Sequence, residues 1–241
     1  MSGHSKWHNI QGRKGKQDAV KSSLFSKYSK IISIAARAGA DSATNFSLRL
    51  AIEKAKSAGM PKDNIERAIK KGAGGPGEGV QVEESIYEAF GPGGAAVLVK
   101  VVTDNKNRTL QEIKHIFSDY GGALGGPGSV LWMFSQFGYI ELQSSGFGAK
   151  REEFEMSLIE AGAEDIVEGG EGMIEIKTKV ENLKKVLDKI KELGLEPKES
   201  GLIWAAKDKV VVSEEIRAKL ENLFADLESN EDVEDYYTNA E

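Results

Sequence analysis

The stretch 72–79, GAGGPGEG, divides the chain into two parts with different sequence patterns. It holds five glycines and one proline in eight residues, a composition typical of flexible connections. Before it, apolar residues recur at helical spacing, whereas after it short apolar runs alternate with helical patterns. We therefore predict a basic helical domain at residues 1–72, a Gly-rich hinge at 73–80 and an α+β region beyond.

Three helices are predicted before the hinge. The first covers residues 18–38 and the other two cover 46–58 and 61–71, each followed by a glycine. The residues expected to face inward are Val20, Leu24, Tyr28, Ile31 and Ala35 in the first helix, Leu48, Ile52 and Ala55 in the second, and Ile65, Ala68 and Ile69 in the third.

Short strands and helices alternate after the hinge, as in ferredoxin-like α+β modules. Strands are expected at 95–102, 139–143, near Ile166, and at 173–177, 202–206, 210–212 and 233–237, and helices at 108–120, 151–161, 181–193 and 213–227. The strand at 95–102 lacks following partners, so we expect the C-terminal strand–helix–strand to complete its sheet. The fold class is thus α+β multi-domain: 81–134 plus 207–241 form one ferredoxin-like domain, and 135–206 form a second, inserted in it.

The charge of the chain is unevenly distributed. Its net charge is −6, yet residues 1–72 hold 15 Lys/Arg and only 5 Asp/Glu, a net of +10. Such a split predicts a basic module that binds a polyanion, joined to an acidic body. The alternative is that the basic segment docks on the acidic part of its own chain.

A nucleic acid offers phosphates to lysine and arginine, and bases to aromatic side chains. Trp7 is either a stacking residue or an anchor that packs the N-terminal arm on the helices. In the first helix, Lys27, Lys30 and Arg37 are expected on the face away from the apolar stripe. The candidate nucleic-acid contacts are Lys6, Trp7, Arg13, Lys14, Lys16, Lys27, Lys30, Arg37, Arg49, Lys54, Lys62, Arg67, Lys70 and Lys71. No helix-turn-helix, zinc-finger or RNP signature distinguishes DNA from RNA.

Several other classes of function are disfavoured. The chain has no cysteine, which excludes thiolate catalysis and disulfides and fits a cytoplasmic location. Of its three histidines, His4 and His8 have no acidic residue near them in sequence, and His115 lies in a predicted helix. The glycine clusters at 91–94 and 121–129 read as turns, because neither has the order or the lysine of a nucleotide-binding loop. We expect no enzyme activity, cofactor, metal or small-molecule substrate.

Specific motifs run along almost the whole chain. They are Gly3–Trp7, Asn9-Ile10, Arg13-Lys14, Gln17-Asp18, Lys54-Ala55, Met60–Gly72, Tyr87–Gly94, Thr103–Asn105, Asn107–Thr109, Gly128–Val130 and Asp232-Val233. With them the chain resembles the YebC/PmpR family and its relative, the mitochondrial translational activator of cytochrome c oxidase. His8, Gly12 and Gly15 depart from the pattern and blur which residues of the arm make contacts.

The resemblance implies an N-terminal helical domain and two α+β domains, one inserted in the other, without catalysis. It also implies a regulator of gene expression, for which two partners stay open. One is promoter DNA, bound by a transcriptional regulator. The other is ribosomal RNA, bound by a translation factor that assists synthesis of proline-rich sequences. From the charge alone, a scaffold whose basic domain binds an acidic protein also stays open.

Overall fold

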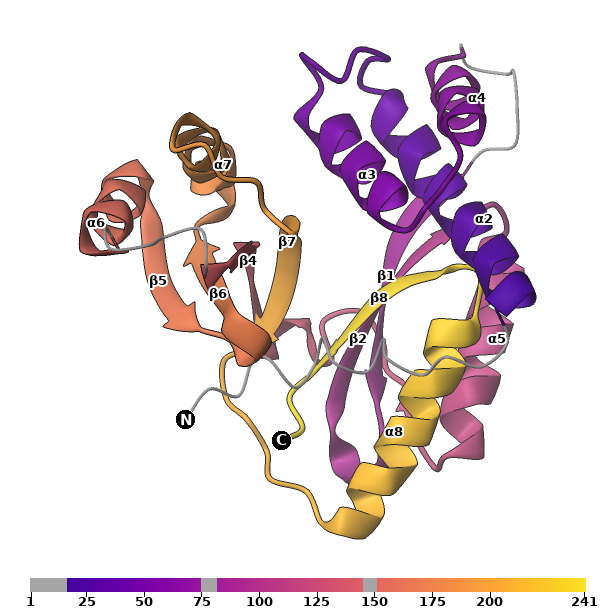
Figure 1. The fold of residues 1–241 in the computed structure, drawn as a ribbon. Helices are drawn as coiled ribbons and strands as arrows, with labels where there is room; N and C mark the ends of the chain where they lie inside the picture. The colour runs from indigo at the N-terminus through magenta and orange to yellow at the C-terminus, as the bar shows by residue number, and fades with distance from the viewer. Residues whose placement is uncertain (1–16, 75–81, 145–150) are drawn as a thin grey trace. The chain divides into compact units, whose positions relative to one another are not determined.

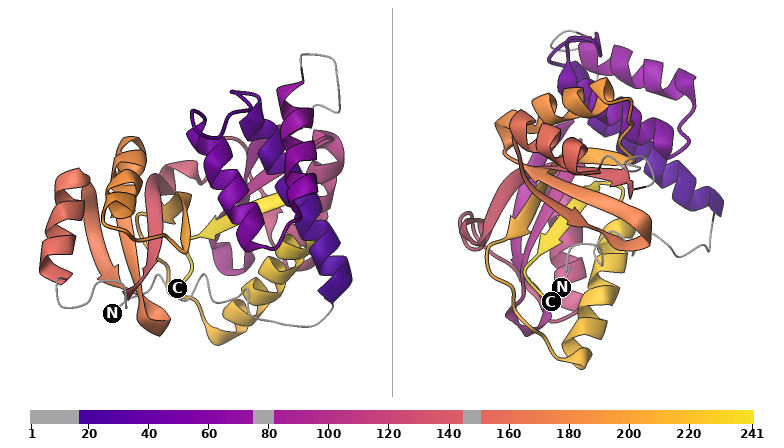
Figure 2. Two further views of the ribbon diagram at one scale, coloured as in Figure 1. Left: turned by 45° about the horizontal axis from the view of Figure 1, so that its top comes forward. Right: turned by 60° about the vertical axis from the view of Figure 1, so that its left-hand side comes forward.

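The computed structural model describes residues 17–74, 82–144 and 151–241 (Figures 1 and 2). The chain forms two compact units. Of the described residues, one unit contains Ser135–Ala205, and the other contains 17–134 together with Ala206–Glu241. The helical segment and the first sheet therefore belong to the same unit. The predicted hinge falls largely on residues 75–81, outside the described residues.

Three helices form the N-terminal part of the larger unit, as predicted. They are α2 (Gln17–Ala36), α3 (Phe46–Ser57) and α4 (Lys62–Ala73). Their common core holds Ile32, Ala36, Leu48, Ala51, Ala55, Met60, Ile65 and Ala68. The inward face of α2 is centred on Ile32 and Ala36, one position beyond the predicted Ile31 and Ala35, which are only partly buried.

This shift follows from how closely α2 and α4 approach. The Ser33 hydroxyl is buried and donates to the carbonyl of Ala68 at 3.0 Å. A Cβ added at Gly72 would lie 2.1 Å from the carbonyl oxygen of Ser33. Only glycine fits there, so Gly72 is a packing residue of α4, which continues past it to Ala73.

The first sheet has four strands in the order β3-β1-β2-β8. They are β1 (Glu83–Phe90), β2 (Ala96–Thr103), β3 (Ala123–Leu124) and β8 (Val233–Thr238), all antiparallel to their neighbours. Helices α5 (Lys106–Asp119) and α8 (Glu214–Ser229) lie side by side against it (Figure 1), and Phe224 of α8 stacks on Tyr236 at 4.6 Å. The C-terminal strand completes this sheet, as expected.

Two predictions for this sheet were wrong. Strand β1 was missed because EESIYEAF shows no regular alternation of polar and apolar residues and contains three glutamates, which are depleted in strands. It nevertheless pairs with β2 along its whole length, from Glu83 opposite Thr103 to Phe90 opposite Ala96. The expected strand at 210–212 is reduced to an isolated bridge between Val210 and Ala240.

The second sheet belongs to the unit Ser135–Ala205 and has the order β5-β6-β4-β7. Its elements are β4 (Phe134–Gln143), α6 (Arg151–Ala161), β5 (Ala163–Glu168), β6 (Met173–Thr178), α7 (Leu183–Glu192) and β7 (Glu199–Ala206). This βαββαβ sequence is the ferredoxin-like one. The first sheet begins instead with the β1–β2 hairpin. Short 3-10 turns complete the fold at Pro92–Gly94, Leu131–Met133, Gly170–Gly172 and Val180–Asn182.

Hydrogen bonds join the two chain segments that connect the larger unit to the second unit. The backbone N–H of Lys207 donates to the carbonyl of Met133 at 2.9 Å. The Lys207 ammonium donates to the carbonyl of Trp132 at 2.6 Å. The chain thus leaves the larger unit and re-enters it at one place.

Candidate nucleic-acid interface

The exposed basic residues of the helical segment are concentrated on α4. Its inward residues Ile65, Ala68 and Gly72 are buried, so the helical repeat turns Lys62, Arg67, Lys70 and Lys71 outward. Within the described parts of the chain, no carboxylate pairs with Arg67, Lys70 or Lys71. Lys62 lies 3.6 Å from Glu66, with both side chains largely exposed. We call Arg67, Lys70 and Lys71 the outer basic surface.

Three further candidates lie on or next to α2 and α3. Arg37 is exposed just after the end of α2. Arg49 is partly exposed, and its guanidinium lies over the Phe46 ring, 5.4 Å from the centroid. Lys54, in the last turn of α3, is also partly exposed. These three are compatible with a contact role, although Arg49 and Lys54 offer less surface than the α4 residues.

Lys30 is occupied by an acidic partner from another part of the unit. Its ammonium donates to Asp232 Oδ1 at 2.5 Å, and to the carbonyl of Glu231 at 3.5 Å. Only 14% of its side chain is exposed. The predicted face of α2, away from the apolar stripe, is therefore not open to solvent at Lys30, because this side chain is bonded to Asp232 in the turn before β8. This is the self-docking alternative raised by the charge split.

Lys27, one turn earlier on α2, lies in the same environment. Burial lowers its pKa, and the pull of Asp235, Glu234 and Glu228 opposes that effect, while Lys54 adds to it. Lys27 is thus partly withdrawn from solvent, and the charges of these carboxylates act on it.

Asp232 is the centre of the network that receives Lys30. Its side chain is 3% exposed, and besides Lys30 it accepts from Arg108 at 2.8 Å, Thr109 at 2.6 Å and Thr103 at 3.1 Å. Burial alone would raise the pKa of Asp232, but the bonds from Arg108, Lys30 and Thr109 outweigh it and lower the pKa to about 2. The carboxylate is therefore ionised and fully partnered at neutral pH.

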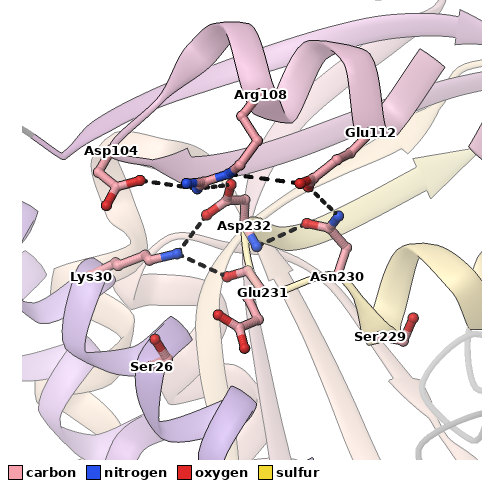
Figure 3. A pocket seen from close by; sticks show the side chains of 9 residues that line it. All are labelled: Ser26, Lys30, Asp104, Arg108, Glu112, Ser229, Asn230, Glu231 and Asp232. Atoms are coloured by element: carbon pink, nitrogen blue, oxygen red, sulfur yellow. Dashed lines mark hydrogen bonds and ion pairs between the residues drawn. The ribbon is translucent and has the colours of Figure 1, made fainter. Parts of the chain in front are cut away.

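A polar pocket opens beside this network (Figure 3). The side chains of Arg108 and Lys30 converge on Asp232 there, from α5 and α2 respectively. Arg108 also pairs with Asp104 at 3.0 Å, and Glu112 accepts from Asn230 at 2.9 Å. The pocket is lined by Ser26, Lys30, Asp104, Arg108, Glu112, Ser229, Asn230, Glu231 and Asp232. Four of these nine are acidic, so the pocket does not suit a phosphate.

The glycine loop before β4 holds an anion from its own chain. The Glu88 carboxylate accepts the backbone N–H groups of Gly128 at 2.6 Å, Val130 at 2.7 Å and Leu131 at 2.7 Å. Burial raises the pKa of Glu88, but these three bonds lower it below its ordinary value. The loop that superficially resembles a phosphate loop is filled by Glu88.

The remaining candidates lie either outside the described residues or on the surface. Lys6, Trp7, Arg13, Lys14, Lys16, His4 and His8 all lie outside the described residues. His115 is a surface residue, 78% exposed, 3.3 Å from Asp119. Within 17–74, 82–144 and 151–241, no three His, Asp or Glu side chains are arranged to hold a metal ion. In the same ranges no helix is both long and apolar enough to cross a bilayer.

Sequence reasoning missed the Asp232 network. Its members Thr103, Arg108, Thr109 and Asp232 all lie in or beside the motifs noted above, but at positions up to 129 residues apart. The sequence shows these residues as separate motifs. They come together in space because β8 pairs with β2, which the motifs alone do not reveal.

Comparison with known proteins supports one family along the whole chain. The model of the TACO1/YebC protein N-terminal domain matches residues 5–75, and that of the TACO1/YebC second and third domain matches residues 82–240. A relative from Caldanaerobacter subterraneus is 45% identical, covering 100% of this chain and 98% of its own. One from Thermotoga maritima is 46% identical, covering 100% and 94%. Both are named "Probable transcriptional regulatory protein".

A solved structure has the same fold. The crystal structure of a conserved hypothetical protein from Aquifex aeolicus matches with a TM-score of 0.85 and 42% identity, covering 98% of this chain and 97% of that one. Family models, full-length relatives and this structure agree with the helical segment and the two α+β sheets described above. The chain belongs to the TACO1/YebC family.

Proposed function

We propose that the protein is a non-enzymatic regulator of gene expression that binds nucleic acid through its helical segment, in the cytoplasm. The observation that carries this proposal is the outer basic surface, Arg67, Lys70 and Lys71, exposed together on α4 without carboxylate partners among the described residues. The names of the relatives support a role in transcription, so DNA is the first partner to test.

The physical basis is the release of counterions. Each lysine or arginine that neutralises a phosphate releases condensed cations, so binding weakens as salt rises. The three residues span little more than one turn of α4, a spacing that suits successive phosphates of one backbone. Phosphate contacts carry no base specificity, so any sequence preference must arise elsewhere in the protein.

The test is a triple variant, R67Q/K70Q/K71Q, titrated with duplex DNA over a range of salt. We expect weaker binding, and a log–log salt slope shallower by up to about three units, at roughly 0.9 per phosphate contact. The matched control is K179Q/K184Q/K185Q, which removes the same charge from exposed lysines beside and on α7. An unchanged slope in the α4 variant, or equal loss in the control, contradicts the proposal.

Ribosomal RNA presents the same phosphates, so competition decides between the two nucleic acids. If promoter DNA is the partner, specific binding persists in excess unrelated DNA at physiological salt. If RNA is the partner, ribosome sedimentation of the full chain is lost in R67Q/K70Q/K71Q and retained in the control. If nuclease treatment leaves all partner complexes intact, the binding partner is a protein and the proposal is wrong.

A further inference from the structure

The helical segment has a second basic face, which differs from the outer basic surface in its surroundings. Lys27 and Lys30 lie three residues apart on α2 and turn toward the same side. Lys30 is bonded to Asp232, and the negative charges of Asp235, Glu234 and Glu228 act on Lys27. Asp232 lies in the turn between α8 and β8, Glu234 and Asp235 lie in β8, and Glu228 lies in the last turn of α8.

The contact is built to hold a lysine. Asp232 is buried and also accepts hydrogen bonds from Thr103, Arg108 and Thr109, so groups other than Lys30 hold its carboxylate in place. Lys30 crosses from α2 to reach it over a separation of 202 residues in sequence. An ion pair of low exposure is little screened by salt, unlike a surface pair.

We infer that Asp232, together with the carboxylates of β8, acts as an intramolecular competitor of nucleic acid, holding the α2 lysines in a closed state and releasing them when α2 separates from this part of the chain. This inference rests on the proposed function. In the closed state only the outer basic surface and its neighbours meet phosphates. In the open state Lys27 and Lys30 add two further contacts, and the polyanion favours that state because it binds it more tightly.

A mutant cycle tests this competition by titration of the full chain with duplex DNA and with structured RNA. K30A alone should change the affinity less than about twofold, because Lys30 is occupied by Asp232 in the closed state. D232N should strengthen binding about fivefold or more. It should also steepen the log–log salt slope by one to two units, at roughly 0.9 per contact. K30A/D232N should lose most of that gain.

Two further variants keep the test decisive. Asp232 is buried, so D232N is first checked for cooperative thermal unfolding. If it does not fold, D235N with K27A provides a parallel cycle at two partly exposed residues whose charges act on each other. E215Q removes the same charge from an exposed residue on α8 that pairs with Lys219, and should leave affinity unchanged.

Each outcome separates this inference from the proposed function. If the wild type binds nucleic acid but D232N and D235N bind no better, the competition is wrong and the proposed function stands. If K30A weakens wild-type binding as much as K70A, Lys30 is a direct contact and the competition is wrong. If the wild type binds nothing while D232N binds through Lys30, the closed state is confirmed. If no variant binds, both proposals fall.

Discussion

At the scale of single residues, Glu88 shows how a carboxylate can hold a glycine loop in place. One oxygen takes the N–H of Gly128, and the other takes those of Val130 and Leu131. Backbone N–H groups that gather in this way form a binding site for an anion, and here the anion is built into β1. The loop precedes the point where the chain leaves the larger unit, so Glu88 also fixes that exit.

Replacing Glu88 by Gln should destabilise the protein by roughly 1–3 kcal/mol at pH 7, because an amide has one acceptor oxygen for three donors. The folded pKa of Glu88 lies below its ordinary value of 4.5, so its ionised form stabilises the fold above that value. This contribution is lost as pH falls through the folded pKa. Urea unfolding measures the free energy of unfolding at pH 7 and below pH 4.5. The difference in this free energy between wild type and E88Q should be smaller at the lower pH.

The matched control for this change is E160Q, at an exposed position of α6. It should change stability by less than about 0.5 kcal/mol at either pH. If the difference in free energy of unfolding between wild type and E88Q is the same at both pH values, the charge of Glu88 does not hold the loop.

At the scale of elements, Asn45 joins two helices. Its side chain accepts the N–H of Leu48 at 3.0 Å as the N-cap of α3. Its amide also donates to the carbonyls of Ala35 and Gly39, each at 2.7 Å, at the end of α2. One side chain therefore starts one helix and satisfies carbonyls at the end of another.

We expect Asn45→Ala to cost roughly 2–3 kcal/mol, from a lost cap and two unsatisfied carbonyls. Asn45→Asp keeps the cap but loses both donors, so it should recover only part of this loss. The comparison is Asn105→Ala, which removes the N-cap bond of α5 to Arg108 and should cost about 1 kcal/mol. Chemical denaturation of the three variants measures the free energy of unfolding that each one loses. Equal costs at Asn45 and Asn105 would show that the α2 contacts contribute nothing.

The elements also show what the sequence can and cannot predict. Helix α6 was predicted with its observed bounds, since its start and end are marked by local residues. Strand β1 was missed, because its pairing is decided by β2 and not by its own composition. In the candidate interface, the α4 lysines follow from helical periodicity. The low exposure of Lys30 does not, because it depends on Asp232, 202 residues further along the chain.

At the scale of the whole molecule, the way the second unit joins the first is the main organising feature. Residues 135–205 leave and return at Phe134 and Ala206. The Met133–Lys207 hydrogen bond, at 2.9 Å, brings the two connections together. The sheet β3-β1-β2-β8 takes no strand from the other unit, and Lys30 of the helical segment is bonded to Asp232, just before β8. We therefore propose that residues 135–205 form an insertion that the rest of the chain does not need for folding.

Replacing residues 135–205 by a short Gly-Ser linker should leave a chain that folds cooperatively. The two points that the linker would join are already close, because the N–H of Lys207 donates to the carbonyl of Met133. The entropic cost of closing the linker is therefore about that of a short loop. The core that packs on the first sheet, including Leu98, Ile113 and Phe117, lies entirely in the retained part. Far-UV circular dichroism and thermal unfolding test whether the shortened chain folds, and a broad, non-cooperative transition would contradict this prediction.

If the helical segment carries the binding, the shortened chain should also keep the salt slope of the full protein for duplex DNA. Loss of that slope in a folded chain would assign phosphate contacts to the insertion.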